Sequence, residues 1–245
     1  MIIYHDIEYK ENLFVDLYVP ETGEFDLFVY FHGGGLVNGS RKDAEAFAKT
    51  LTKNNIATAS VEYRMYPNAK FPDFIKDCAY SIRWLKDNIK NYGKCNRVFV
   101  GGSSAGGYLS MMLCFDERYL KEVEILPTDI AGYIHDAGQP TAHFKVLSEF
   151  GKDSRRLIVD ETAPMYFVGL EEKYPPMLFL VSDNDMFARY EQTVLMVKTL
   201  EHFGHKDDVY LQVLHGKHCE HTLKIDENGE GVLGNIIIDF INKLK

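Results

Sequence analysis

The sequence has no apolar stretch that approaches the length needed to span a bilayer. Its first residues also lack a basic segment followed by an apolar core, so we expect no signal peptide. Positive charge is in short supply, because 27 lysines and arginines face 36 aspartates and glutamates, which gives a formal net charge of -9. Nucleic acids and anionic membranes bind basic patches, so we expect neither as a partner.

Cysteine is scarce and scattered. Cys78, Cys95, Cys114 and Cys219 form no C-x-x-C pair and no closely spaced framework. We therefore expect reduced thiols in a reducing compartment, and hence a cytoplasmic protein.

Internal repeats, low-complexity segments and linkers are also missing, so the sequence offers no place for a domain boundary. Its 245 residues are enough to bury one sizeable core. The apolar fraction of 46% is typical of a globular protein. We expect one domain over residues 1–245.

The chain does contain a regular alternation of strand-like and helix-like segments. Two β-like segments at the start, with Asn12 between them, predict an antiparallel edge hairpin over residues 2–9 and 13–19. The alternation that follows predicts an α/β fold, a mostly parallel sheet with helices on both faces. The expected strands are residues 27–31, 56–62, 98–100, 130–134, 177–181 and 209–214; the expected helices are residues 43–54, 72–91, 105–115, 187–202 and 232–244. In such sheets, ligands bind beyond the carboxyl ends of the strands.

A glycine-flanked serine follows the expected strand 98–100 and precedes the expected helix 105–115. The motif is Gly102-Ser103-Ser104-Ala105-Gly106. A serine hydroxyl is a poor nucleophile unless a base takes its proton and the backbone holds it exposed. A sharp turn from strand to helix provides that exposure, and the glycines let the two elements approach closely. A glycine-rich turn in any parallel sheet would look similar, but we expect Ser104 to be a nucleophile.

A second glycine-rich motif, His32-Gly33-Gly34-Gly35, follows the expected strand 27–31. Three consecutive glycines leave backbone N–H groups uncovered by side chains, which suits a pocket for a developing oxyanion. A flexible turn is the alternative. Together, the two motifs indicate acyl transfer much more strongly than either one does separately.

A serine nucleophile needs a histidine base and usually a carboxylate that orients the histidine. Asp185 follows the expected strand 177–181, and His218 follows the expected strand 209–214, so both fall at the carboxyl end of the sheet. Asp183 competes with Asp185, and His215 and His221 compete with His218.

Two other chemistries are conceivable in the segment 215–221. Three histidines at a spacing of three, with Glu220 beside them, suggest zinc, but a metal site would leave Ser104 and the glycine loop unexplained. Cys219 could be a thiol nucleophile, yet no strand-to-helix turn surrounds it. We expect no metal and no cofactor.

The chain resembles an α/β-hydrolase of the esterase/lipase type, in the branch of hormone-sensitive-lipase-like and feruloyl-esterase-like carboxylesterases. The resemblance extends from about residue 27 to the C-terminus. Besides the two glycine motifs, the residues that match this family are Tyr63-Arg64-Met65-Tyr66-Pro67, Phe71-Pro72, Asp77 and Trp84-Leu85. Within this segment, Arg64 and Asp77 are expected to form a structural ion pair.

By position, the resemblance implies that Ser104 is the nucleophile, Asp185 the orienting acid and His218 the base. The backbone amides of Gly33, Gly34 and Ala105 would form the oxyanion hole. The implied reaction is hydrolysis of a small-molecule carboxylic ester, of a short-chain or carbohydrate-linked acyl group. An arylformamidase-type amide hydrolase and a catalytically silent ligand-binding protein of the same fold are the alternatives.

The position of His32 indicates the capless branch, because only a hairpin fits before it, where relatives of hormone-sensitive lipase carry a helical cap. Any lid would come from residues 136–174. In or beside this segment, four aromatic side chains could contact substrate, although such residues more often serve in packing: Tyr133, His135, Phe144 and Tyr166. The sequence gives no indication of the oligomeric state.

Overall fold

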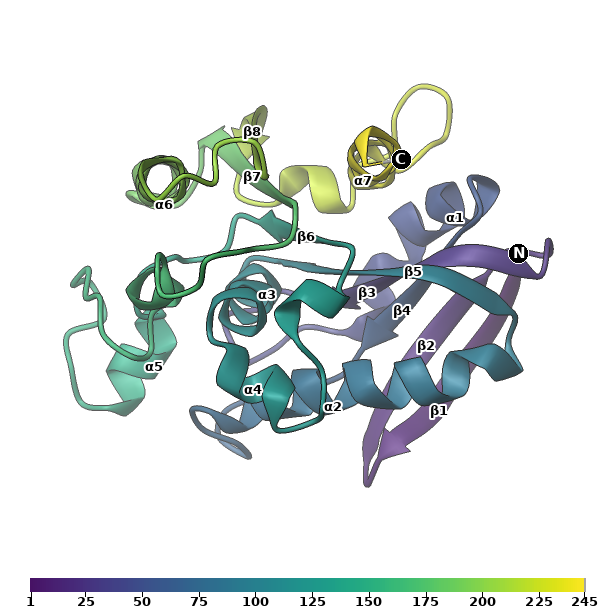
Figure 1. The fold of residues 1–245 in the computed structure, drawn as a ribbon, viewed down its shortest axis with the longest axis horizontal. Helices are drawn as coiled ribbons and strands as arrows, with labels where there is room; N and C mark the ends of the chain where they lie inside the picture. The colour runs from purple at the N-terminus through teal and green to yellow at the C-terminus, as the bar shows by residue number, and fades with distance from the viewer. Residues whose placement is uncertain (245) are drawn as a thin grey trace.

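The computed structural model describes residues 1–244, which form an eight-stranded sheet with helices on both faces (Figure 1). The strands are β1 (Ile2–Lys10), β2 (Leu13–Val19), β3 (Glu24–Phe31), β4 (Ile56–Val61), β5 (Lys94–Ser103), β6 (Gly132–Asp136), β7 (Met177–Asn184) and β8 (Val209–Lys217). The α-helices are α1 (Glu45–Lys53), α2 (Asp73–Asn88), α3 (Ala105–Phe115), α4 (Glu117–Lys121), α5 (Phe144–Glu149), α6 (Arg189–His202) and α7 (Val232–Lys243). Short 3-10 helices are η1 (Arg41–Ala44), η2 (Ile89–Asn91), η3 (Pro127–Asp129), η4 (Pro164–Phe167) and η5 (Glu220–Thr222).

The strand order is β1-β2-β4-β3-β5-β6-β7-β8. Strands β1 and β2 form the predicted antiparallel hairpin, in which Asn12 has a positive φ of 57° at the turn. Strand β2 is also antiparallel to β4, and every later pairing, from β4–β3 to β7–β8, is parallel. The prediction of a mostly parallel sheet with antiparallel N-terminal strands is therefore confirmed.

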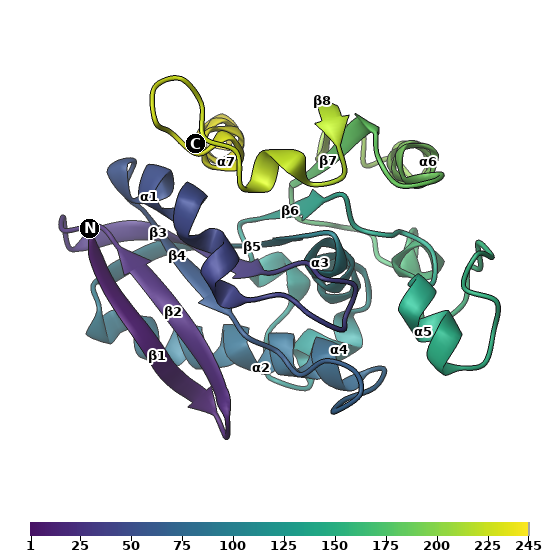
Figure 2. The same ribbon diagram turned by 180° about the vertical axis from the view of Figure 1, so that it is seen from behind.

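Strand β3 shows why both faces of the sheet are covered. Successive side chains of a strand point to opposite faces, and every second residue of β3 joins a different core. Leu27, Val29 and Phe31 belong to the core that includes α2 and α3. Phe28 and Tyr30 belong to the core that includes α1 and α7 (Figure 2). Complete burial of an aromatic or aliphatic side chain stabilises the fold by about 1.5–3 kcal/mol.

The parallel strands bring the ends of β3, β5, β6, β7 and β8 to one edge of the sheet. Strand β5 continues to Ser103 and β8 to Lys217, so both are longer than the segments 98–100 and 209–214 that their apolar residues predict. The additional residues extend toward the carboxyl edge, where Ser104 and His218 follow directly.

The segment between β6 and β7 contains α5 and η4, which the sequence pattern does not predict. That this segment forms a lid stays a prediction. Among residues 1–244, no helix combines the length and the apolar character that crossing a membrane requires.

The expected ion pair of Arg64 and Asp77 is present, with Arg64 Nε 2.7 Å from Asp77 Oδ2. Asp77 is buried, and Lys10 Nζ on β1 lies 2.6 Å from its other oxygen. This carboxylate therefore connects the N-terminal hairpin to α2 and to the segment that follows β4.

Candidate active site

Ser104 occupies a sharp turn between β5 and α3. Its backbone has φ 56° and ψ -113°, outside the regions that L-residues favour, and its N–H donates to the carbonyl of Asp136 at 2.7 Å. The flanking glycines are sterically required: a Cβ at Gly106 would lie 1.8 Å from the carbonyl oxygen of Phe31, and one at Gly102 would lie 2.5 Å from the same atom. The turn therefore depends on close packing of α3 against β3.

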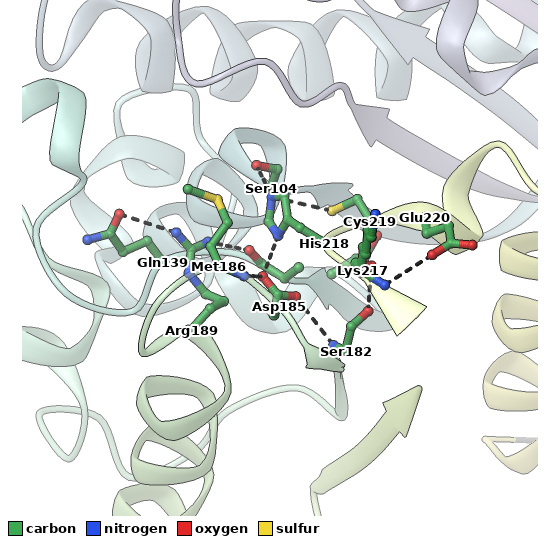
Figure 3. A network of polar contacts seen from close by, with 12 residues as sticks. Ser104, Gln139, Ser182, Asp185, Met186, Arg189, Lys217, His218, Cys219 and Glu220 are labelled. Carbon is green, nitrogen blue, oxygen red and sulfur yellow. Dashed lines mark hydrogen bonds and ion pairs between the residues drawn. The ribbon is translucent and has the colours of Figure 1, made fainter. Parts of the chain in front are cut away.

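His218 joins Ser104 to Asp185 across three separate segments of the chain (Figure 3). Its Nε2 lies 2.8 Å from Ser104 Oγ, and its Nδ1 lies 2.5 Å from Asp185 Oδ1. An imidazole that donates Nδ1–H to the carboxylate leaves Nε2 free to accept the serine hydroxyl. This is the geometry that a serine nucleophile with a histidine base requires.

Asp185 is fixed by backbone amides as well as by His218. The N–H of Met186 donates to Oδ1 at 2.7 Å, and the N–H of Ser182 donates to Oδ2 at 3.3 Å. Burial would raise the pKa of Asp185, but the hydrogen bond and the charge of His218, with these two amides, lower the pKa below its usual value. The carboxylate is therefore ionised at neutral pH.

The competing acid and base residues lie elsewhere. Asp183 accepts from exposed His215, with Nδ1 and Oδ2 2.7 Å apart, and His215 is 97% exposed. His221 turns into the protein, where its Nε2 lies 2.9 Å from Asp136 Oδ1. Among the candidate acids and bases, His218 contacts Ser104 and Asp185 contacts His218, so these two residues form a connected chain with the serine.

The three histidines of the segment 215–221 thus point to three different carboxylates. Within the described part of the chain, residues 1–244, no three His, Cys, Asp or Glu side chains gather around a position that could hold a metal ion. Cys219 lies beside His218, with Sγ 3.7 Å from Nε2, and burial raises the pKa of its thiol well above the usual value. A thiol in that state is a poor nucleophile.

The glycine-rich motif after β3 folds back over the serine. Gly34 has a φ of 113°, and a Cβ there would lie 2.0 Å from the carbonyl oxygen of Asn38. Such a backbone is open only to glycine. An added Cβ at Gly33 would lie 3.3 Å from the Cβ of Ser104, so this backbone passes directly beside the hydroxyl.

His32 anchors this loop from inside the protein. Its ring stacks on Tyr63 with centroids 4.5 Å apart, and the Tyr63 hydroxyl donates to the His32 carbonyl at 2.8 Å. Nδ1 lies 2.7 Å from the Gly33 carbonyl oxygen, and burial lowers the pKa of His32. The neutral ring is therefore a rigid support for the glycines.

A cavity of about 390 Å³ opens above Ser104 and is large enough for a small ligand. Gly33, Gly34, Ser104 and His218 line one part of it. Phe144, Met186 and Leu223 contribute apolar wall. The site therefore combines a polar reacting edge with an apolar surface.

Only one of the four aromatic candidates near the segment 136–174 reaches this cavity. Phe144 lines it, whereas Tyr133 and His135 are buried in the sheet and Tyr166 is exposed on η4. His135 is enclosed by Tyr133 and Phe179, and burial lowers its pKa to about 3. Tyr133 and His135 therefore serve in core packing and do not contact the cavity.

Two residues beside the site, Asp136 and Arg189, are not among the residues predicted from the sequence. Asp136 ends β6 at the carboxyl edge, so the rule that selected Asp185 and His218 could also have selected it. Arg189 begins α6, four residues after Asp185, and no sequence pattern distinguishes it from a solvent-exposed arginine.

The sequence is similar to known proteins over about half of its length. A family model described as BD-FAE matches residues 15–152. A probable isoprenylcysteine alpha-carbonyl methylesterase from Arabidopsis thaliana is 31% identical over 111 residues, which are 44% of this chain and 26% of that protein. The chain thus spans about a quarter of the length of this relative.

Solved structures match over nearly the whole chain. Esterase B from Lactobacillus rhamnosis has a TM-score of 0.79 at 17% identity, with 99% of this chain and 85% of that chain covered. Thermogutta terrifontis esterase 2, phosphoramylated by tabun, has a TM-score of 0.76 at 17% identity, with 98% and 92% covered. At such identity, these matches establish the fold. Because the family model covers more than half of the sequence and the architecture agrees, this chain belongs to the BD-FAE family and has the α/β-hydrolase fold that the resemblance implied.

Proposed function

We propose that the protein is a serine hydrolase that cleaves carboxylic esters through an acyl-enzyme. The contact chain from Ser104 Oγ through His218 to Asp185 carries this proposal, because each atom is at hydrogen-bonding distance from the next. The strained turn at Ser104 and the glycine loop beside it also support the proposal.

In the proposed reaction, His218 Nε2 accepts the proton of Ser104 while Oγ attacks the ester carbonyl carbon. The resulting tetrahedral intermediate collapses when His218 returns the proton to the leaving alcohol. Water then repeats the sequence, with His218 as base, and releases the acid. Asp185 remains ionised throughout and stabilises the imidazolium.

We assign the oxyanion hole to the backbone N–H groups of Gly33, Gly34 and Ala105. Ala105 is the first residue of α3, and the first N–H groups of a helix have no acceptor within that helix. The helix dipole also places partial positive charge at this end. Gly33 and Gly34 approach from the other side of Ser104 without side chains that would cover their amides.

A short acyl group fits the dimensions of the cavity. The volume of about 390 Å³ is near the lower end for small-molecule sites, and Phe144 and Met186 offer apolar contact. Carbohydrate-linked acyl esters belong to the same proposal, because the cavity is open to solvent and does not enclose a polar alcohol. All three relatives named above are esterases by name, and one of them is phosphoramylated by tabun.

Turnover of p-nitrophenyl acetate tests the proposal. We expect Ser104→Ala to lower kcat by about 10⁴-fold or more, because no other group supplies the nucleophile. A fluorophosphonate probe should label the parent at Ser104 and leave Ser104→Ala unlabelled. Ser154→Ala, which changes an exposed serine, is the matched control and should behave as the parent.

Equal turnover by the parent and Ser104→Ala would refute the nucleophile. A parent protein that neither cleaves the ester nor reacts with the fluorophosphonate would be a binding protein with a hydrolase fold, and the proposal would fail.

A further inference from the structure

Arg189 is a buried arginine without a carboxylate partner. It is 4% exposed, although arginine is rarely buried unless it is paired. Among residues 1–244, it makes no ion pair: Nη1 donates to the carbonyl of Ala137, Nη2 lies 3.4 Å from Gln139 Oε1, and Nε has no partner. Burial of an unpaired charge lowers the stability of the fold, so the buried guanidinium of Arg189 points to a role other than stabilisation.

The two acceptors of Arg189 lie two residues apart in the loop after β6, and each is linked to a different part of the site. Ala137 follows Asp136, whose carbonyl accepts the N–H of Ser104 at 2.7 Å. Gln139 Oε1 also accepts the N–H of Phe144 at 3.2 Å, and Phe144 lines the cavity. Arg189 thus connects the support of the serine turn with the apolar wall.

The same residue is tied to the loop that carries Asp185. The Arg189 N–H donates to the carbonyl of Met186 at 3.0 Å, which closes a tight turn between Asp185 and α6. Ala188 in this turn has a positive φ of 57°, a conformation that an L-residue rarely adopts. Figure 3 shows Arg189 beside Met186 and Asp185, with Gln139 on its far side.

The charge of Arg189 acts on this corner of the protein. Burial lowers the pKa of the guanidinium, and the negative charge of Asp185 acts in the opposite direction. An arginine remains protonated even so, because its ordinary pKa lies far above neutral. The titratable groups that interact with its charge are Asp185, Cys219 and buried His143. Asp136, Glu220 and His221 lie around Cys219 in the same corner.

We propose that Arg189 is a positioning residue of the active site, which fixes the Asp185 loop, the end of β6 and the Phe144 wall in one arrangement and holds a permanent positive charge behind the carboxylate. This inference rests on the proposed function, because it concerns the same reaction. Arg189 itself does not line the cavity, so it acts through Asp185, Ala137 and Gln139.

The pH dependence of kcat/KM separates this role from simple structural support. The positive charge of Arg189 acts on Asp185, and a positive charge disfavours the protonated forms of the groups around it. In Arg189→Gln that charge is gone, so the acid limb of the profile should move to higher pH, by about half a unit or more. We also expect kcat to fall about tenfold or more, because small displacements of reacting groups are costly.

Two further variants make the test decisive. Arg189→Lys keeps the charge but cannot reach both acceptors, so we expect the acid limb of the parent with a lower kcat. Lys198→Gln removes a charge from an exposed position of the same helix and should leave both quantities unchanged.

An Arg189→Gln variant that folds and keeps the kcat or the acid limb of the parent would overturn the proposal. If Arg189→Gln does not fold, Arg189→Lys decides, and a parental kcat in that variant would refute the positioning role. Failure of the proposed function is distinguishable, because the parent itself would then show no Ser104-dependent turnover.

Discussion

Two of the three histidines in the segment 215–221, His218 and His221, differ in which ring nitrogen meets their aspartate partner. His218 gives Nδ1 to Asp185 and presents Nε2 to Ser104. His221 gives Nε2 to Asp136, is buried, and makes no contact with the serine hydroxyl. The same two residue types therefore form a partly buried reacting pair and a fully internal structural pair, and ring orientation distinguishes them.

The internal pair connects the end of β6 to the loop that carries His218. Asp136 ends β6, and its side chain also lies 3.3 Å from the Thr222 hydroxyl of η5. Its carbonyl holds the N–H of Ser104. The His221–Asp136 pair thus fixes the distance between the segment that carries His218 and the turn that carries Ser104.

The proposed difference between the two histidines would be refuted if His221 could replace His218 as the base. We expect His218→Ala to lower kcat for p-nitrophenyl acetate by about 10⁴-fold or more, because the Nε2 of His221 is occupied by Asp136. Steady-state turnover measures this, with His221→Ala as the paired variant. A His218→Ala variant with more than about one hundredth of the parental kcat would show that another base reaches Ser104.

His221→Gln sharpens the comparison through stability. Burial alone would lower the pKa of His221, but the charge of Asp136 and its hydrogen bond raise it above the usual value. A raised pKa stabilises the folded protein fully below the pKa of an unfolded histidine, about 6.5, and this contribution disappears as the pH rises through the folded value.

Glutamine can keep a hydrogen bond to Asp136 but carries no charge. We therefore expect His221→Gln to lower the free energy of unfolding by about 1–3 kcal/mol at pH 6, and by less at pH 9. Urea unfolding at both pH values measures the difference. A deficit that grows toward pH 9 would mean that the pair is not ionised in the folded protein.

The smallest effect should come from the third pair, Asp183 and His215. His215 is almost completely exposed, and exposed ion pairs contribute little. We expect Asp183→Asn to keep kcat/KM and the melting temperature close to parental values, within about twofold and about 2 °C. A large loss of turnover would show that Asp183, and not only Asp185, takes part in orienting the base.

The strand pattern and the glycine motifs predicted the parallel sheet and the location of Ser104 well, because both follow from local sequence. Position after a strand also selected Asp185 and His218, although Asp183 and His221 met the same criterion. Neither ring orientation nor the choice of partner is a local property: His221 turns inward because Asp136 of a distant strand is buried there.

Other features were beyond local patterns for a similar reason. The segment 136–174 is short of periodic apolar residues, so α5 was not predicted, and its conformation depends on contacts such as that of Gln139 with Phe144. Arg189 became significant only through its burial, which depends on the packing of α6 beside β7.

Strand β8, which leads to His218, has a neighbour on one side only, whereas β5, which leads to Ser104, lies in the interior of the sheet. His218 therefore follows an edge strand, which can open locally. Ser104 follows a central strand, which we expect to open only when the whole domain unfolds. We therefore expect activity to be lost at milder conditions than the fold, when β8 opens before the rest of the sheet.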